Sequence, residues 1–324
     1  MNASLHRRLL LALALLLPFA AWAKYPERPI KLVVPYPAGG TTDVLARLVA
    51  RNMSTSLGQE VVVENKAGAA TIIGVDAVAK APNDGYTILL ATATSFAVNP
   101  HLYKKLPYRL DEFVPIGFIS EAPIVLVSPA SSPAKDLPEL IRGLKAPGVE
   151  TAVATTGKGG FSHLTAAMFF NAINAKFRDV PYRGEAPALQ DLLGGRWACT
   201  SAACRAPCST SPRAACAATA SRRWAARPPP RPSPRSPSRA CRRWWPPPWF
   251  GLSAPRGTPA DVVATLGAAL NTAMQDKALL ARMAAEGAVG RTLKPAEFSE
   301  FIRKDHERWG VIVRAANVEV DEPK

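Results

Sequence analysis

Two segments of this chain share a pattern in which an apolar strand runs into a pair of glycines and then into a helix. In the first, the apolar run 30–34 leads into the loop 36–43, Tyr-Pro-Ala-Gly-Gly-Thr-Thr-Asp, and apolar residues then recur at helical spacing. In the second, residues 151–154 lead into Thr-Thr-Gly-Lys-Gly-Gly-Phe-Ser-His at 155–163 and a second helical pattern. Thr41, Thr42 or Asp43 is expected to cap the first helix and Ser162 the second. Glycines let the backbone approach a ligand closely, and a helix N-terminus offers free N–H groups and a positive dipole end. The loops therefore suit an anion such as a carboxylate or phosphate, unless they only turn the chain.

Strands and helices continue to alternate along the chain. Further strands are predicted at 61–64, 86–91, 113–119, 124–127 and 179–182, and helices at 136–144, 186–193, 259–270, 279–283 and 295–316, with Asp136 as the N-cap of the first of these helices. This alternation predicts a mainly parallel sheet, whose ligands bind at the carboxyl ends of the strands. The loop 36–43, the small-residue loop 65–70 and the hydroxyl cluster Thr92, Thr94 and Ser95 all follow such ends. Their convergence favours ligand binding over a simple turn.

The N-terminus has the pattern of a secretory signal. Arg7 and Arg8 precede the apolar run 9–19, and Ala21-Trp22-Ala23 fits a small-x-small cleavage site before Lys24. The apolar run is too short to span a bilayer comfortably. We therefore expect residues 1–23 to be removed and the mature protein to be soluble and exported.

The formal net charge of +15 invites a nucleic-acid-binding interpretation, but its distribution argues against one. Ten arginines lie within the window 197–248, which contains no Asp or Glu. Without these ten and Arg7 and Arg8, the net charge falls from +15 to +3, so the rest of the chain is nearly balanced. All five cysteines lie in the same window, and their spacings include no pair typical of a metal site.

The window 197–248 is either a disordered basic linker or the product of two compensating frame errors in GC-rich DNA. It contains no Val, Ile or Leu, and five cysteines with four tryptophans are unusual for a linker. The codons GGC CTG CCG GCG GTG GTG GCC encode Gly-Leu-Pro-Ala-Val-Val-Ala. Read one base later, they encode the Ala-Cys-Arg-Arg-Trp-Trp-Pro of residues 240–246. We favour the frame errors.

As written, the window predicts a second domain without core strands. A loss on that scale exceeds the roughly 5–15 kcal/mol by which a domain is stable, so we expect misfolding and poor ligand binding.

Several phrases, taken in their order and spacing, resemble the substrate-binding proteins of tripartite tricarboxylate transporters, the Bug-type periplasmic receptors. The matching phrases include Pro35-Tyr36-Pro37-Ala38-Gly39-Gly40 with Asp43, Val63-Glu64-Asn65-Lys66, Val180-Pro181-Tyr182-Arg183-Gly184 and Trp249-Phe250-Gly251-Leu252. The resemblance covers residues 24–196 and 249–324 and leaves out the arginine-rich window.

The resemblance implies an α/β, two-lobed clamshell of the type II periplasmic-binding-protein kind, each lobe a mainly parallel sheet flanked by helices. Residues 24–124 and 249–324 would form one lobe and 125–248 the other. A small organic acid, such as a di- or tricarboxylate, would be held between the lobes and delivered to inner-membrane transporter subunits. No cofactor, metal or nucleic acid is expected. The expected ligand contacts are Tyr36, Pro37, Ala38, Gly39, Gly40, Thr42, Asp43, Thr92, Thr94, Ser95, Thr156, Gly157, Gly160, Ser162, His163 and Tyr182.

The alternative is an α/β enzyme acting on a small anionic substrate. Ser162 and His163 are adjacent in sequence, but there is no Gly-x-Ser-x-Gly elbow, and the phosphate-loop pattern at 157–160 is incomplete. Arg183 could bind a ligand carboxylate, although we expect it to pair with Asp179 at the end of a strand.

Overall fold

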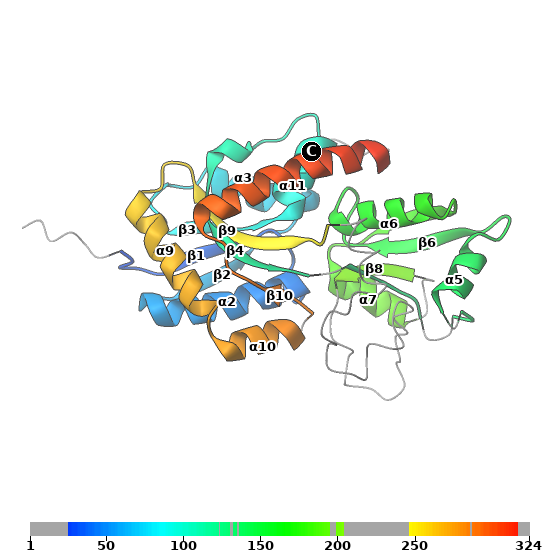
Figure 1. Cartoon of the computed structure of the whole chain (residues 1–324), viewed down its shortest axis with the longest axis horizontal. Coiled ribbons are helices and arrows are strands. Elements are labelled where there is room, and N and C mark those ends of the chain that lie inside the picture. The colour runs from blue at the N-terminus through cyan, green and yellow to red at the C-terminus, as the bar shows by residue number, and fades with distance from the viewer. Residues whose placement is uncertain are drawn as a thin grey trace, which may run out of the picture.

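The computed structural model describes residues 25–122, 124–129, 132–134, 136–194, 199–203, 246–285 and 287–316. Two β-sheets form the centres of two lobes that lie side by side (Figure 1). We call the six-stranded sheet with its helices the first lobe and the four-stranded sheet with its helices the second lobe. The chain enters the second lobe after β4 (Phe113–Glu121) and returns through β9 (Trp249–Pro255).

The sheet of the first lobe has the strand order β10-β4-β9-β3-β1-β2. The central strand β1 (Ile30–Val34) pairs in parallel with β2 (Val61–Asn65) and β3 (Thr87–Thr92), as the alternation of strands and helices predicts. The other half differs from a mainly parallel sheet. There β9 is antiparallel to both β3 and β4, and β10 (Val289–Gly290) is antiparallel to β4. This follows because β9 brings the chain back from the second lobe.

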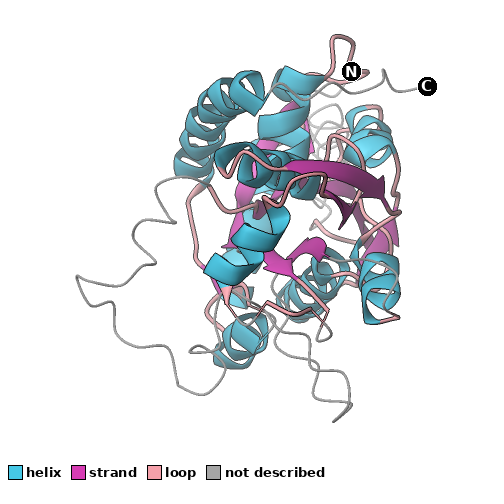
Figure 2. Cartoon of the chain, turned by 90° about the vertical axis from the view of Figure 1, so that its right-hand side faces the viewer, coloured by secondary structure: helices cyan, strands magenta, loops and turns pink. Residues whose placement is uncertain are grey.

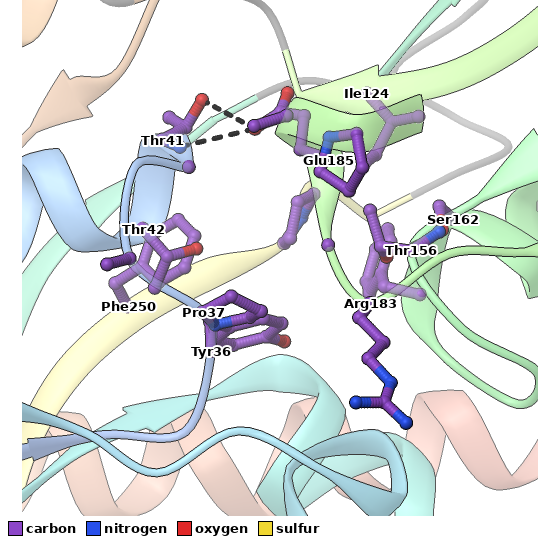
Figure 3. A pocket seen from close by; sticks show the side chains of 17 residues that line it. Tyr36, Pro37, Thr41, Thr42, Ile124, Thr156, Ser162, Arg183, Glu185 and Phe250 are labelled. Atoms are coloured by element: carbon purple, nitrogen blue, oxygen red, sulfur yellow. Dashed lines mark hydrogen bonds between the residues drawn. The ribbon is translucent and has the colours of Figure 1, made fainter. Parts of the chain in front are cut away.

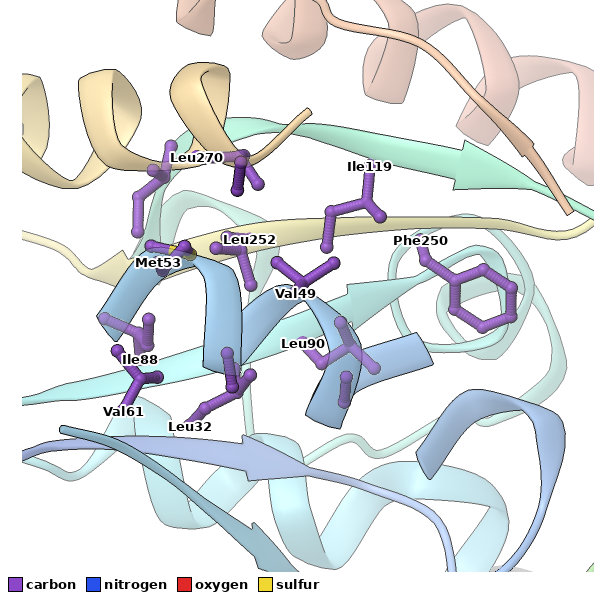
Figure 4. Close-up of a cluster of buried hydrophobic side chains, with 14 of the residues drawn as sticks. Leu32, Val49, Met53, Val61, Ile88, Leu90, Ile119, Phe250, Leu252 and Leu270 are labelled. Carbon is purple, nitrogen blue, oxygen red and sulfur yellow. The ribbon is translucent and has the colours of Figure 1, made fainter. Parts of the chain in front are cut away.

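Helices cover both faces of this sheet (Figure 1, Figure 2). One face packs against α2 (Thr41–Leu57), α9 (Ala260–Ala273) and α10 (Lys277–Ala285). Figure 4 shows this core, in which Val49 and Met53 of α2 lie over Leu90 and Leu252 of the strands. Burying such side chains stabilises the lobe by about 1.5–3 kcal/mol each.

The core on the opposite face combines aliphatic side chains with several aromatic ones. Trp249, Phe298 and Phe118 are fully buried there. The elements that cover this face or connect its strands are η1 (Ala69–Thr71), α3 (Ile72–Ala79), η2 (Thr94–Val98), α4 (Asn99–Leu102), η3 (Leu110–Glu112) and α11 (Pro295–Ala316).

The second lobe is built on the strand order β5-β8-β6-β7. Its strands are β5 (Ile124–Val127), β6 (Glu150–Thr155), β7 (Lys176–Pro181) and β8 (Cys199–Ala203), and its helices are α5 (Leu137–Leu144), α6 (Phe161–Ala172) and α7 (Glu185–Leu193). Within this sheet β6 is parallel to β7 and β8, whereas β5 is antiparallel to β8. Its core is a small cluster that includes Leu140, Val153 and Phe170.

Strand β8 corrects one prediction, because residues 199–203 belong to the window 197–248 that we expect to supply no strand. Its backbone pairs with β5 on one side and β6 on the other. Strand pairing uses the backbone N–H and C=O groups that every residue except proline carries, so a segment without Val, Ile or Leu can form it. The rest of the window up to residue 245 lies outside the described residues, as do the predicted signal 1–23 and residues 317–324.

No helix among the described residues is both long enough and apolar enough to cross a membrane.

Candidate functional site

A pocket lies between the two lobes, where the loop before α2 faces the loop before α6 (Figure 3). It encloses about 80 Å³ that water-sized groups can occupy. The lining residues are Tyr36, Pro37, Ala38, Gly40, Thr41, Thr42, Ile124, Thr156, Phe161, Ser162, Arg183, Gly184, Glu185, Ala186, Pro187, Pro248 and Phe250.

The first wall of the pocket is the loop 36–42, which is held in shape from behind by Asp43. One oxygen of this buried carboxylate accepts the backbone N–H of Gly39 at 3.0 Å and the Arg47 Nε–H at 3.0 Å. The other oxygen accepts from Asn65, whose amide also donates to the Tyr36 carbonyl. Burial acts to raise the pKa of Asp43, but the hydrogen bonds from Arg47, Gly39 and Asn65 outweigh it and hold this pKa below its ordinary value.

The second wall is the loop 156–162, which is held by neutral side chains. Ser162 accepts the backbone N–H of Thr156 at 2.9 Å, and His163 Nδ1 accepts that of Gly159 at 3.0 Å. His163 is only 7% exposed. This burial lowers the pKa of His163, Asp179 nearby opposes the effect, and Lys158 adds to it. The imidazole is therefore neutral near pH 7 and can accept the bond from Gly159.

Three helices begin at the pocket without a side-chain cap. The N-caps of α2, α6 and α7 are Gly40, Gly160 and Gly184, and none makes a side-chain capping bond. By contrast, α5, on the outer side of the second lobe, is capped by Asp136, as the sequence predicts. The prediction that Thr41, Thr42 or Asp43 caps α2 is wrong, as is that of Ser162 for α6. Uncapped helix ends leave first-turn N–H groups available to an anion.

The two lobes touch directly at one edge of the pocket. Glu185, the first residue of α7, lies against the N-terminus of α2 and accepts hydrogen bonds from Thr41 N–H at 3.2 Å and Thr41 Oγ1 at 2.9 Å (Figure 3). Gly184 has φ +122° and lies against Pro37, whose Cγ would be only 3.1 Å from a Cβ at this position. A glycine is therefore needed to bring Glu185 this close.

Seven of the residues predicted to contact a ligand line this pocket: Tyr36, Pro37, Ala38, Gly40, Thr42, Thr156 and Ser162. Others support these residues from behind and do not line it. Gly39 and Asp43 shape the first loop, and Gly157, Gly160 and His163 belong to the second.

The predicted hydroxyl cluster at the end of β3 lies behind the first loop and outside the pocket wall. Thr94 accepts a hydrogen bond from the Tyr36 hydroxyl at 3.1 Å. Thr92 and Ser95 bond to each other, and Ser95 also bonds to Thr71. The hydroxyls of Thr92, Ser95 and Thr71 satisfy one another in the interior, and Thr94 separately holds the hydroxyl of Tyr36, whose ring faces the pocket.

Tyr182 and Arg183 differ from expectation. The Tyr182 hydroxyl donates to Asp191 at 2.7 Å, and Tyr182 does not line the pocket. The expected ion pair between Arg183 and Asp179 is wrong, because Asp179 accepts from Thr155 and faces His163. Arg183 instead lines the pocket, and Figure 3 shows its side chain extending away from Glu185.

The sequence did not identify several lining residues. The sequence shows Glu185 as an acidic residue that follows a glycine in the first turn of a helix. No local sequence pattern indicates that its side chain reaches the other lobe. The remaining missed residues are Thr41, Ile124, Phe161, Gly184, Ala186, Pro187, Pro248 and Phe250. Among the described residues, no cluster of His, Cys, Asp and Glu could hold a metal ion.

Comparison with known proteins identifies the family of this fold. The model of the tripartite tricarboxylate transporter family receptor matches residues 45–318. The BugT protein of Bordetella pertussis (strain Tohama I) is 36% identical over 299 residues, which cover 90% of each chain.

Two solved structures extend the comparison. The periplasmic binding protein BugD superposes with a TM-score of 0.76 at 30% identity, covering 91% of this chain and 99% of BugD. Rpa4515 of R. palustris, solved with adipate, gives a TM-score of 0.76 at 26% identity, covering 91% of this chain and 99% of that protein.

Proposed function

Because this chain belongs to the tripartite tricarboxylate transporter receptor family, we propose that it captures a small organic acid between its lobes and delivers it to the membrane subunits of such a transporter. The adipate bound by its structural neighbour Rpa4515 is a ligand of the same class. The family is one of receptors, and we propose no catalytic role.

The observation that carries this proposal is that both glycine loops border one cavity. Loop 36–42 and loop 156–162 approach it from opposite lobes, and each leads into a helix without a side-chain cap. An anion at such a helix end gains roughly 0.3–1 kcal/mol at an exposed site and more when partly buried. Two ends closing on one ligand add their contributions, and this differential affinity favours the closed arrangement of the lobes.

The proposed ligand contacts are backbone N–H groups of the two loops and hydroxyls from Thr42, Thr156 and Ser162. The N–H groups of Gly39, Thr41, Thr156, Gly159 and Gly160 are not among them, because they already bond to acceptors within the protein. Tyr36 and Phe250 offer apolar surface to the body of the ligand. Arg183 adds a cation, because it makes no ion pair with an acidic side chain of the described residues, and a guanidinium can bind a carboxylate with two hydrogen bonds.

Ser162 and His163 bond to different partners and not to each other, which disfavours the enzyme alternative.

A thermal-shift screen of the purified protein against mono-, di- and tricarboxylates tests this function. A ligand at 100 times its dissociation constant adds about 2.7 kcal/mol to the free energy of unfolding, which raises the melting temperature. Arg183→Gln should weaken binding about tenfold by removing a charge-assisted contact. Arg178→Gln, which removes an exposed arginine from β7 outside the pocket, is the matched control and should bind as the wild type does. If no organic acid shifts the melting temperature, the proposed function is wrong.

We also propose that residues 1–23 are a signal removed before Lys24 and that the mature protein acts as a periplasmic monomer. Mass spectrometry of protein recovered from a periplasmic fraction, with size-exclusion chromatography, tests both points. An N-terminus at Met1 or a larger assembly would contradict them.

Two compensating frame errors remain our proposal for the composition of the window 197–248. Resequencing the gene and translating its other frames tests this. A segment rich in Val, Leu, Asp and Glu in another frame is expected, and its absence would refute the idea.

A further inference from the structure

The walls of the pocket are mostly apolar. Tyr36 and Phe250 line it from the first lobe (Figure 3), and Ile124 and Phe161 line it from the second. The Tyr36 hydroxyl donates to Thr94 behind the first loop, so this residue presents its ring to the pocket. The lining also includes three prolines, which have no backbone N–H to donate: Pro37, Pro187 and Pro248.

Most of the aliphatic hydroxyls at the pocket already form hydrogen bonds within the protein. The Thr41 hydroxyl donates to Glu185 Oε2 at 2.9 Å, and the same oxygen accepts the Thr41 N–H. Thr156 Oγ1 and Ser162 Oγ share a hydrogen bond of 2.8 Å, which leaves this pair one hydroxyl proton for a ligand. Among the described lining residues, Thr42 has the one aliphatic hydroxyl that makes no hydrogen bond to another described residue.

The side-chain donors that remain suit a carboxylate and leave little for the rest of the ligand. Arg183, the Thr42 hydroxyl and the remaining proton of the Thr156–Ser162 pair can all donate to a carboxylate. A hydroxyl on the body of the ligand would exchange its hydrogen bonds with water for contacts with Phe250 or Ile124, and a buried hydroxyl without a partner is costly. A hydrocarbon body has no such cost, and its burial against these side chains is favourable.

We propose that this receptor selects organic acids with a hydrocarbon body over polyhydroxylated acids of the same length and charge. This inference rests on the proposed function, since it assigns the ligand class of the same site. Two features set the selection, namely the apolar walls and the hydrogen bonds that the pocket hydroxyls already make within the protein.

Three pairs of acids test the proposal by varying only the hydroxyl groups on a fixed carbon chain: hexanoate with gluconate, adipate with galactarate, and succinate with tartrate. At pH 7 the two acids of each pair carry the same charge, so the comparison within a pair does not depend on the charged side chains of the pocket. Isothermal titration calorimetry should show that the acid without hydroxyls binds about tenfold or more tightly in each pair. The ratio should be larger for adipate against galactarate than for succinate against tartrate, because galactarate carries more hydroxyls.

Ile124→Thr is the decisive variant, because it places a hydroxyl in the apolar wall. Ile124→Val is its matched reference, since valine and threonine have the same shape and differ by a methyl in place of the hydroxyl. Relative to Ile124→Val, Ile124→Thr should lower the ratio of adipate to galactarate affinity about fivefold by offering a ligand hydroxyl a partner. Val125→Thr adds the same hydroxyl to the next residue of β5, which does not line the pocket, and should leave the ratio unchanged.

The outcomes separate this inference from the function on which it rests. If the hydroxylated acid binds as tightly as its partner or more tightly in any pair, or if Ile124→Thr and Ile124→Val give the same ratio, the selectivity proposal is wrong and the receptor function stands. If none of the six acids binds, the selectivity proposal is also wrong, and the thermal-shift screen of mono-, di- and tricarboxylates decides the receptor function separately. Circular dichroism of each variant confirms that a changed affinity is not a loss of fold.

Discussion

The two glycine loops have the same backbone plan and different supports. Gly39 and Gly159 have φ near +85° and +77°, and each precedes the glycine that begins its helix. In each loop, the N–H of this glycine donates a 3.0 Å hydrogen bond to the side chain of the third residue of that helix. That residue is Asp43 in the first lobe and His163 in the second.

The first loop is held by a charged carboxylate and the second by a neutral imidazole ring. Asp43 is anionic and is also bonded to Arg47 and Asn65, so it links the loop to α2 and to β2. His163 accepts from Gly159 and has Asp179 3.9 Å from its other nitrogen. The first loop should therefore be the stiffer half of the site, and the second the half that responds to conditions.

Replacing the two supports should give the largest contrast. Asp43→Ala leaves Arg47, Asn65 and the Gly39 N–H without their shared acceptor, so we expect a loss of about 3 kcal/mol in the free energy of unfolding. His163→Ala removes a neutral bond and some packing, and should cost about 1–2 kcal/mol. Urea unfolding of both variants measures the difference. Equal losses would show that the charged support is no stronger than the neutral one.

Glycine substitutions should show that the two backbones are equivalent. Gly39→Ala places a side chain at φ +85°, where strain of about 1–2 kcal/mol is expected although the space beside it is open. Gly159→Ala should cost a similar amount, because its φ is similar.

Gly40→Ala is the matched control for this pair. Gly40 has an ordinary extended backbone, and a Cβ there would meet nothing closer than 3.9 Å. Its unfolding midpoint should therefore stay near that of the wild type. If Gly39→Ala were tolerated equally well, positive φ would not be the reason for the glycine.

The sequence predicts those parts of the site that depend on neighbouring residues, and it does not predict contacts between distant segments. The strand at 30–34, the glycine pair that follows it and their repeat at 151–160 are visible because strand, turn and helix preferences act over a few residues. The helix N-caps were wrong by one to three residues, because Asp43 and Ser162 bond to the loop behind them and do not cap a helix. Glu185 and Phe250 could not be found locally, since they reach the pocket only when two distant segments pack together.

Acidification should weaken the second loop and leave the first unchanged. Of the effects predicted here this is the smallest, but it is confined to one loop. Burial lowers the pKa of His163 from its ordinary value of 6.5, so the unfolded chain binds a proton more readily than the folded one. The contribution of neutral His163 to stability is complete above pH 6.5 and is lost as the pH falls through the folded pKa, by at most about 1.4 kcal/mol per pH unit. Protonated His163 cannot accept the Gly159 N–H, so ligand affinity should fall over the same interval. Because the pKa of Asp43 lies below its ordinary value, Asp43 keeps its hydrogen bond to the first loop over this pH interval.

Comparison with His163→Gln isolates this effect, because glutamine can accept a hydrogen bond and does not titrate. His101 in the first lobe also has a pKa lowered by burial, so the wild-type curve of stability against pH contains both histidines. The difference between the wild-type and His163→Gln curves below pH 6.5 belongs to His163 alone. If the two curves were parallel from pH 7 to pH 5, the neutral ring would not be the titrating support of the second loop, and the two halves of the site would respond to acid alike.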